Sequence, residues 1–218
     1  MRKLVIFDLD GTLINSIADL GGATNYALEK LGFPQHEEKA YLDFVGRGIM
    51  KLFEQALPAQ ARTPQYLARM KELFVPYYDK HGMDRALPYE GIADVLKTLS
   101  ARGILLAVVS NKYHAATVKI VQHYFPTVPF VGIYGQREGF PMKPDPALVH
   151  DIIQQAQVTS AQTLYVGDSD VDMQTARNAA VDACAVLWGF RPREELASYQ
   201  PRYMAETPAD LLRILLSE

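Results

Sequence analysis

Apolar residues follow two different patterns along this chain, and the two alternate from residue 88 onward. Short, continuous apolar runs bounded by polar residues or glycine predict buried strands, whereas longer stretches with helical spacing predict helices. Strands alternating with helices at this spacing favour an α/β fold with a parallel sheet and helices on both faces. The expected strands are 3–8, 104–109, 130–133, 163–166 and 183–187, and the expected helices are 92–101, 114–124, 146–155, 171–180 and 209–216.

The segment between the first two strands has a different hydrophobic pattern. Helices are expected at 16–31, 49–57 and 64–81, where Pro64 suits a first helical position, and no strand pattern interrupts them. We therefore predict an α/β core made of residues 1–15 and 86–218, interrupted by an inserted all-helical cap domain at 16–85.

Composition narrows the classes of protein that fit. The 218 residues are 49% hydrophobic and carry 22 Lys+Arg against 25 Asp+Glu, a balance without the basic excess of nucleic-acid-binding proteins. A single cysteine excludes a disulfide framework or a thiolate metal site. The apolar run at the N-terminus is too short for a signal peptide, and no run approaches a membrane span. We expect a cytoplasmic protein with no membrane and no nucleic-acid partner; its oligomeric state stays open.

Polar side chains follow several of the predicted strands. Asp8 and Asp10 follow the first, Ser110 the second and Asp168 the fourth, while Lys143 lies in the loop before the helix at 146–155. The carboxyl ends of parallel strands meet at one edge of a sheet, where open α/β folds bind their ligands. Carboxylates gathered there suit Mg²⁺, and a lysine with a hydroxyl suits a phosphate. The sequence thus predicts a site for a phosphorylated ligand and a divalent cation.

Each element of this pattern also has a simpler interpretation by itself. An Asp-x-Asp pair is often a solvated turn, Ser110-Asn111 could cap a helix that begins at 113, and Lys143 could be a loop lysine. Asp168 and Asp172 could be the cap and first-turn acids of the helix that follows. The simpler interpretations would have to hold independently at every strand end, which favours a functional site.

The motifs occur in an order that resembles the haloacid dehalogenase (HAD) superfamily of phosphatases. They are Asp8-Leu9-Asp10-Gly11-Thr12, Ser110, Lys143-Pro144 and Gly167-Asp168-x-x-x-Asp172. The chain is most similar to the phosphoglycolate phosphatase-like branch, which implies a Rossmann-like core and a helical cap of the C1 type. The helix after Asp172 departs from the pattern, because Ala180 stands near the place where such phosphatases commonly have glycine.

The resemblance implies a Mg²⁺-dependent phosphatase that hydrolyses a small phosphorylated metabolite, with phosphoglycolate the leading guess. Asp8 would attack phosphorus and form an aspartyl-phosphate, and Asp10 would act as the general acid and then the base. The implied Mg²⁺ ligands are the Asp8 carboxylate, the Asp10 backbone carbonyl and Asp168. The implied phosphoryl-binding residues are Thr12, Ser110, Asn111 and Lys143, with Asp172 supporting the metal or the lysine.

Substrate choice would lie with the insertion. Arg47, between Gly46 and Gly48, could pair with a substrate carboxylate, or it could be an exposed arginine between two helices. Lys112 follows Ser110 closely and could line the pocket, but a surface position is expected. A β-phosphoglucomutase-like phosphomutase or a pyrophosphatase would use the same core residues. An alternative from another class is a receiver-like phosphoacceptor module for signalling, although such a module needs no cap.

Overall fold

The computed structural model describes residues 2–217 and divides into two compact units. One unit is formed by residues up to Ile14 together with those from Pro88 onward, and the other is Asn15–Leu87. The chain therefore leaves the first unit once and returns once. The two crossings pair with each other as a short two-stranded sheet of β2 (Ile14–Asn15) and β3 (Leu87–Pro88).

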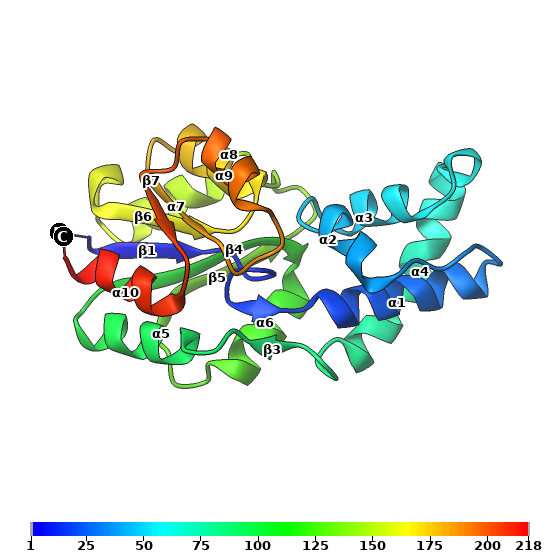
Figure 1. Cartoon of the computed structure of the whole chain (residues 1–218), viewed down its shortest axis with the longest axis horizontal. Coiled ribbons are helices and arrows are strands. Elements are labelled where there is room, and N and C mark those ends of the chain that lie inside the picture. The colour runs from blue at the N-terminus through cyan, green and yellow to red at the C-terminus, as the bar shows by residue number, and fades with distance from the viewer. Residues whose placement is uncertain (1, 218) are drawn as a thin grey trace. The chain divides into compact units, whose positions relative to one another are not determined.

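A six-stranded sheet forms the centre of the first unit, in the order β5-β4-β1-β6-β7-β8 (Figure 1). All neighbouring strands in it are parallel, which confirms the predicted fold class. The chain builds outward from β1 in one direction and then in the other, so it reverses beside the central strand. The strands are β1 (Leu4–Phe7), β4 (Leu105–Tyr113), β5 (Phe130–Gln136), β6 (Thr163–Gly167), β7 (Asp182–Val186) and β8 (Tyr203–Ala205).

Helices cover both faces of this sheet: α7, α8 and α9 lie on one side, and α5, α6 and α10 on the other (Figure 1). The apolar interior between α7, α8 and the sheet includes Leu4, Ile6, Val149 and Tyr165. The helices are α5 (Ile92–Ala101), α6 (His114–Tyr124), α7 (Ala147–Gln155), α8 (Asp170–Asn178), α9 (Arg193–Ser198) and α10 (Pro208–Leu216), with a 3-10 turn at Ser160–Gln162.

Two of these elements were not predicted from the sequence. β8 has three residues at the edge of the sheet, and α9 has six, so neither offers enough apolar positions to show a period. β4 was predicted to end at Val109 but continues to Tyr113. This extension adds the polar residues Ser110, Asn111 and Lys112 to the strand itself.

Between its two end residues, which belong to β2 and β3, the second unit contains only helices and loops. α1 packs against α4, and the buried Tyr41 donates a hydrogen bond from its hydroxyl to Asn25 Oδ1 at 2.6 Å. The buried carboxylate of Asp19 accepts hydrogen bonds from the backbone N–H groups of Arg85 and Ala86, which ties α1 to the end of the unit. The helices are α1 (Ile17–Lys30), α2 (Tyr41–Phe44), α3 (Ile49–Ala56) and α4 (Pro64–His81), with 3-10 turns at Glu38–Ala40 and Ala59–Ala61.

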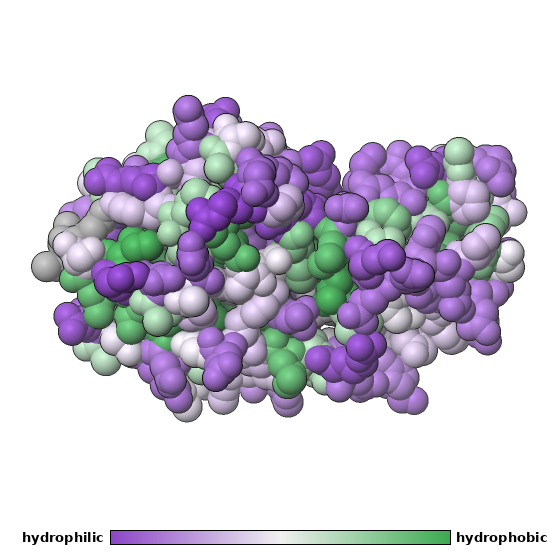
Figure 2. Space-filling model, viewed as in Figure 1, coloured by the Kyte–Doolittle hydropathy of each residue, from purple (hydrophilic) through white to green (hydrophobic). Residues whose placement is uncertain are grey.

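Hydrophilic residues cover most of the face shown in Figure 2, with smaller hydrophobic areas between them. Within residues 2–217, no helix is long and apolar enough to cross a membrane.

Candidate active site

The site lies at the carboxyl ends of β1, β4 and β6, next to the point where the chain reverses direction in the sheet. β1 is hydrogen-bonded to β4 on one side and to β6 on the other, and Phe7 is in register with Val108 and Val166. Asp8 directly follows β1, and Asp168 directly follows β6. The sheet register therefore brings the predicted polar residues of three strands to one edge, as expected for a parallel α/β sheet.

Lys143 lies between two buried carboxylates. Its Nζ is 2.9 Å from Asp8 Oδ1 and 2.7 Å from Asp172 Oδ1, and its side chain is only 3% exposed. The contact with Asp172 is a hydrogen bond, whereas the contact with Asp8 is a short ion pair, and Asp8 Oδ1 is buried with no hydrogen-bond partner. Burial lowers the pKa of Lys143, but the charges of Asp172 and Asp8 outweigh it and hold that pKa well above its usual value. Lys143 is therefore a permanently charged cation beside Asp8.

Asp168 is held by hydrogen bonds and enclosed by two glycines. Thr12 donates from its hydroxyl to Asp168 Oδ1, and the Phe190 backbone N–H donates to Oδ2, both at 2.8 Å. A Cβ on Gly11 would lie 2.1 Å from Asp168 Oδ2, and one on Gly189 would lie 2.2 Å from Asp168 Cβ. Gly11 also has a φ of 87°. Only glycine fits at positions 11 and 189, where the backbone lies against Asp168. The two hydrogen bonds and this close packing hold the Asp168 carboxylate in place.

Asp172, in the first turn of α8, holds the ammonium group of Lys143. Its Oδ1 accepts from Lys143 and, at 3.4 Å, from the Tyr165 hydroxyl, while its Oδ2 accepts from the backbone N–H and the hydroxyl of Ser169. Lys143 and Ser169 are the main donors to this carboxylate, because the single hydroxyl hydrogen of Tyr165 is shared with the Val109 carbonyl at 3.3 Å. The sequence prediction missed Ser169 and Tyr165. Ser169-x-x-Asp172 is a capping-box spacing that could have indicated the first, whereas the tyrosine gives no sequence signal.

The electrostatics and donor set of the site fit a divalent cation. Oxygens of Asp8, Asp168 and Asp172 lie within 4.8 Å of one another. Burial, followed by the charge of Asp172, raises the pKa of Asp8 to about 7 and that of Asp168 to about 8. A nearby cation would favour the ionised form of both. Asp172 is bonded to Lys143 and Ser169, whereas Asp168 keeps an acceptor position on each oxygen and Asp8 Oδ1 receives no directed hydrogen bond. Asp8 and Asp168 are therefore the two carboxylates best placed to accept a hard cation.

Asp10 faces a second lysine. Lys112 Nζ lies 3.0 Å from each of the two Asp10 carboxylate oxygens. The expectation that Lys112 lies at the surface was wrong, because its side chain is only 2% exposed and that of Asp10 is 11% exposed. The error has a physical cause: β4 continues beyond the apolar run and carries Lys112 into the interior. The Asp10 carboxylate therefore belongs to an ion pair separate from the cluster around Lys143.

The other predicted phosphate-binding residues are buried around the same edge. Asn111 Oδ1 accepts from the Lys143 backbone N–H at 2.9 Å, and Asn111 Nδ2 donates to the Lys143 carbonyl at 3.1 Å. Ser110 Oγ accepts from the Lys112 backbone N–H at 3.2 Å. The alternative in which Ser110-Asn111 cap the next helix does not hold, because α6 begins at His114 without a side-chain cap bond. Asn111 fixes the backbone of Lys143, and Thr12 uses its hydroxyl on Asp168.

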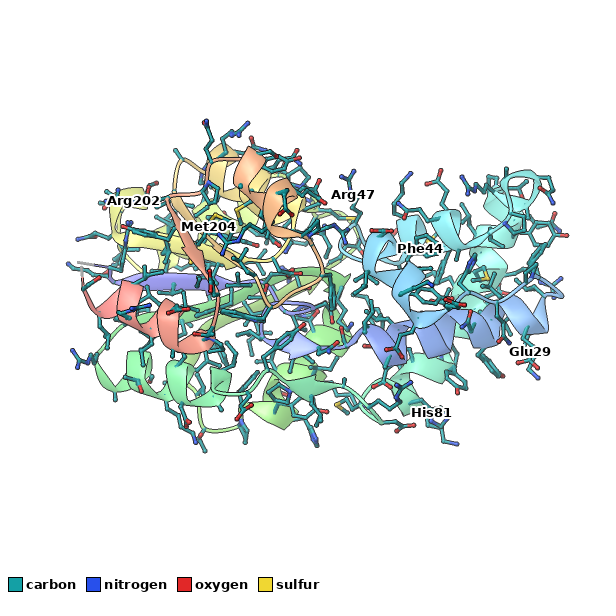
Figure 3. The ribbon with its side chains drawn as sticks, in the orientation of Figure 1. Glu29, Phe44, Arg47, His81, Arg202 and Met204 are labelled. Atoms are coloured by element: carbon teal, nitrogen blue, oxygen red, sulfur yellow. The ribbon has the colours of Figure 1, made fainter. Side chains whose placement is uncertain are left out.

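Arg47 is exposed in the loop between α2 and α3 of the second unit, and its side chain is labelled in Figure 3. In the first unit, Ala180 follows the C-cap of α8 with a left-handed φ of 52°, so the glycine-like conformation is present even though the glycine is not. Backbone bonds close this helix end, including that from the Val181 N–H to the Ala176 carbonyl.

Comparison with known proteins gives consistent matches over the whole chain. The family model for haloacid dehalogenase-like hydrolases matches residues 5–186. Curated relatives named phosphoglycolate phosphatase include one from Vibrio vulnificus, 32% identical over 98% of this chain and 96% of its own, and one from Vibrio parahaemolyticus, 30% identical over the same shares. The crystal structure of a candidate phosphoglycolate phosphatase from Lactobacillus delbrueckii subsp. bulgaricus is 32% identical, covers 100% of both chains and superposes with a TM-score of 0.92.

Proposed function

The chain belongs to the haloacid dehalogenase-like hydrolases and is a phosphoric monoester hydrolase, and from this premise we propose that it is a Mg²⁺-dependent phosphatase acting through an aspartyl-phosphate on Asp8. The proposed substrate is a small phosphorylated metabolite, with 2-phosphoglycolate the first candidate because the curated relatives carry that name. The observation that carries the proposal is the buried Asp8 carboxylate, which lies beside Lys143 and within 4.8 Å of the other acids of its cluster.

In the first step, a carboxylate oxygen of Asp8 attacks phosphorus and the bond to the ester oxygen breaks. Asp10 gives its carboxyl proton to the departing oxygen, so the alcohol leaves neutral. In the second step, Asp10 takes a proton from water as the water oxygen attacks the phosphoryl group on Asp8. Inorganic phosphate leaves, and both carboxyl groups return to their starting states.

Several residues support these steps without exchanging protons. Lys143 provides a positive charge beside the carboxylate of Asp8, and Asp172 and Asn111 hold that lysine in place. The Ser110 hydroxyl, at the same strand end, is proposed as a donor to a phosphoryl oxygen. Mg²⁺, when bound by Asp8, Asp168 and the Asp10 carbonyl, would neutralise negative charge on the transferred phosphoryl group.

The insertion is proposed to choose the substrate. Arg47 is exposed in a glycine-flanked loop and carries the guanidinium fork that matches a carboxylate. We expect Arg47→Ala to raise the Michaelis constant for 2-phosphoglycolate more than for a neutral sugar phosphate. Equal changes for both substrates would remove Arg47 from substrate recognition.

The test of the proposed function is a phosphate-release screen over small phosphorylated metabolites, run with Mg²⁺ and with excess chelator. Asp8→Asn should fold normally and show no turnover, while Asp151→Asn, which changes an exposed acid on α7, should keep full activity. Product analysis separates the hydrolase from the phosphomutase alternative, because a mutase would return an isomerised sugar phosphate. Substantial turnover by Asp8→Asn would overturn the assignment of the nucleophile.

A further inference from the structure

A buried lysine contacts the carboxyl group of Asp10, and neither the motif pattern nor the proposed mechanism uses it. Lys112 Nζ is 3.0 Å from both oxygens of Asp10, and the lysine side chain is 2% exposed. A lysine in this environment loses most of its hydration, so its burial is offset only where its ammonium group is well paired. The ion pair with Asp10 therefore offsets the cost of burying the Lys112 ammonium group.

The extension of β4 explains how Lys112 reaches Asp10. β4 is parallel to β1 and continues past the end of its pairing with that strand, as far as Tyr113. Its pairing with β5 has a register shift between Val109 and Tyr113. Thr117 Oγ1 donates to the Lys112 carbonyl at 3.2 Å, and the Lys112 N–H donates to Ser110 Oγ. These bonds hold the lysine backbone, so the length of the side chain determines how far its ammonium group reaches.

The two lysines of the site serve different acids. Lys143 contacts Asp8 and Asp172, whereas Lys112 contacts both oxygens of Asp10. An aspartate contacted at one oxygen can still rotate its carboxyl plane. Contact at both oxygens from one ammonium group restricts that rotation, because turning the plane lengthens at least one of the two contacts.

We propose that Lys112 is a positioning residue for Asp10, which fixes the carboxyl plane of the ionised group so that it can take a proton from the attacking water. This inference rests on the proposed function and adds a residue to its site. A catalytic group displaced by about 1 Å can cost on the order of 100-fold in rate. Lys112→Met keeps most of the apolar stem and removes the ammonium group. It should lower kcat for 2-phosphoglycolate by roughly 10- to 100-fold and should not raise KM.

A competing role for Lys112 is direct contact with an anionic group of the substrate. The geometry favours positioning, because the ammonium group is placed symmetrically on Asp10 in a nearly closed environment. The two roles differ in kinetics, since a lost substrate contact raises KM. Lys97→Met is the matched control: Lys97 is an exposed lysine on α5, and its replacement should change neither constant. A raised KM with unchanged kcat would overturn the proposal.

The leaving group provides a second readout. p-Nitrophenol leaves as an anion and needs no proton, so the first step with p-nitrophenyl phosphate does not depend on Asp10 as an acid. Lys112→Met should keep the rapid burst of p-nitrophenol and slow the steady state that follows, where Asp10 must accept a proton from water. A retained burst also shows that the variant is folded and that Asp8 is competent. A burst slowed as much as the steady state would overturn the proposal, because the damage would then extend beyond Asp10.

A double-mutant cycle tests whether Lys112 acts through Asp10. In single-turnover measurements of phosphate release from 2-phosphoglycolate, Lys112→Met should cost much less in an Asp10→Asn background than in the wild type. Effects that multiply would assign the lysine a separate role and contradict the proposal. If the proposed function itself were wrong, Asp8→Asn would retain turnover. That result is distinct from both outcomes of the double-mutant cycle.

Discussion

The closest packing in the site predicts that Gly11 tolerates no side chain. In the structure, a Cβ on Gly11 would lie 2.1 Å from Asp168 Oδ2 and 2.6 Å from Asp168 Cγ, and the backbone φ is 87°. Gly103 is a matched control in the same unit, because its φ of 75° is similar and no atom lies within 4 Å of the Cβ position. The two glycines therefore share the backbone strain of a substitution and differ in the steric contact.

The magnitudes follow from these two contributions. Placing an alanine at positive φ costs about 1–2 kcal/mol, offset by about 0.4–1 kcal/mol because the unfolded chain also loses freedom, so Gly103→Ala should destabilise by roughly 1 kcal/mol. Gly11→Ala adds an overpacking cost of about 1–3 kcal/mol, because Asp168 must move and strain its bonds to Thr12 and Phe190. We expect the difference between the two variants to be about 1–3 kcal/mol.

Urea unfolding followed by tryptophan fluorescence measures this difference directly. Trp188 is the single tryptophan and lies in the first unit, so its signal reports the unit that carries both glycines. Phosphate release gives the second readout: Gly103→Ala should keep its activity, and Gly11→Ala should lose it, since Asp168 would no longer occupy its position. Equal unfolding free energies together with normal turnover by Gly11→Ala would refute the steric reasoning.

The remaining predictions concern positions away from the site. Ala180→Gly should raise the unfolding free energy by about 0.5–1 kcal/mol, since the exposed alanine holds a φ of 52°; an unchanged urea midpoint would contradict this. Gly22→Ala should raise thermal stability by about 1 kcal/mol, because nothing lies near its Cβ position on α1. Gly21→Ala should show no such gain in the same circular dichroism melts, because its Cβ would lie 2.8 Å from the buried Tyr41 ring. Burial raises the pKa of the Cys184 thiol to about 12, so the thiolate is scarce at pH 8 and a thiol reagent should label this residue only after unfolding.

The apolar pattern was sufficient to predict most of the first unit. Five of its six sheet strands correspond to continuous apolar runs in the sequence, and the helices 92–101 and 114–124 have the predicted bounds. These elements form where local pattern and tertiary packing agree. The apolar pattern did not predict β8 and α9, because elements of three and six residues contain too few apolar positions to form a recognisable pattern.

Residue types and order were also sufficient to predict which side chains gather at the site. Parallel strands end at the same edge, so Asp8, Lys143 and Asp168 come together without any knowledge of their contacts. Contacts are a different matter. Phosphate binding by Asn111 and Thr12 stays a prediction, whereas their bonds to the Lys143 backbone and to Asp168 could not be read from the sequence.

The sequence by itself thus determined the α/β class of the first unit and the strand ends at which its acids and Lys143 gather, because both depend on the apolar pattern and strand order. Only the tertiary structure decided which cation faces which acid. Lys112 and Lys143 are chemically identical in the sequence, and the length of β4 places the first against Asp10, while Asn111 and Asp172 hold the second beside Asp8. Charge pairing at distances near 3 Å depends on backbone placement that no local pattern encodes.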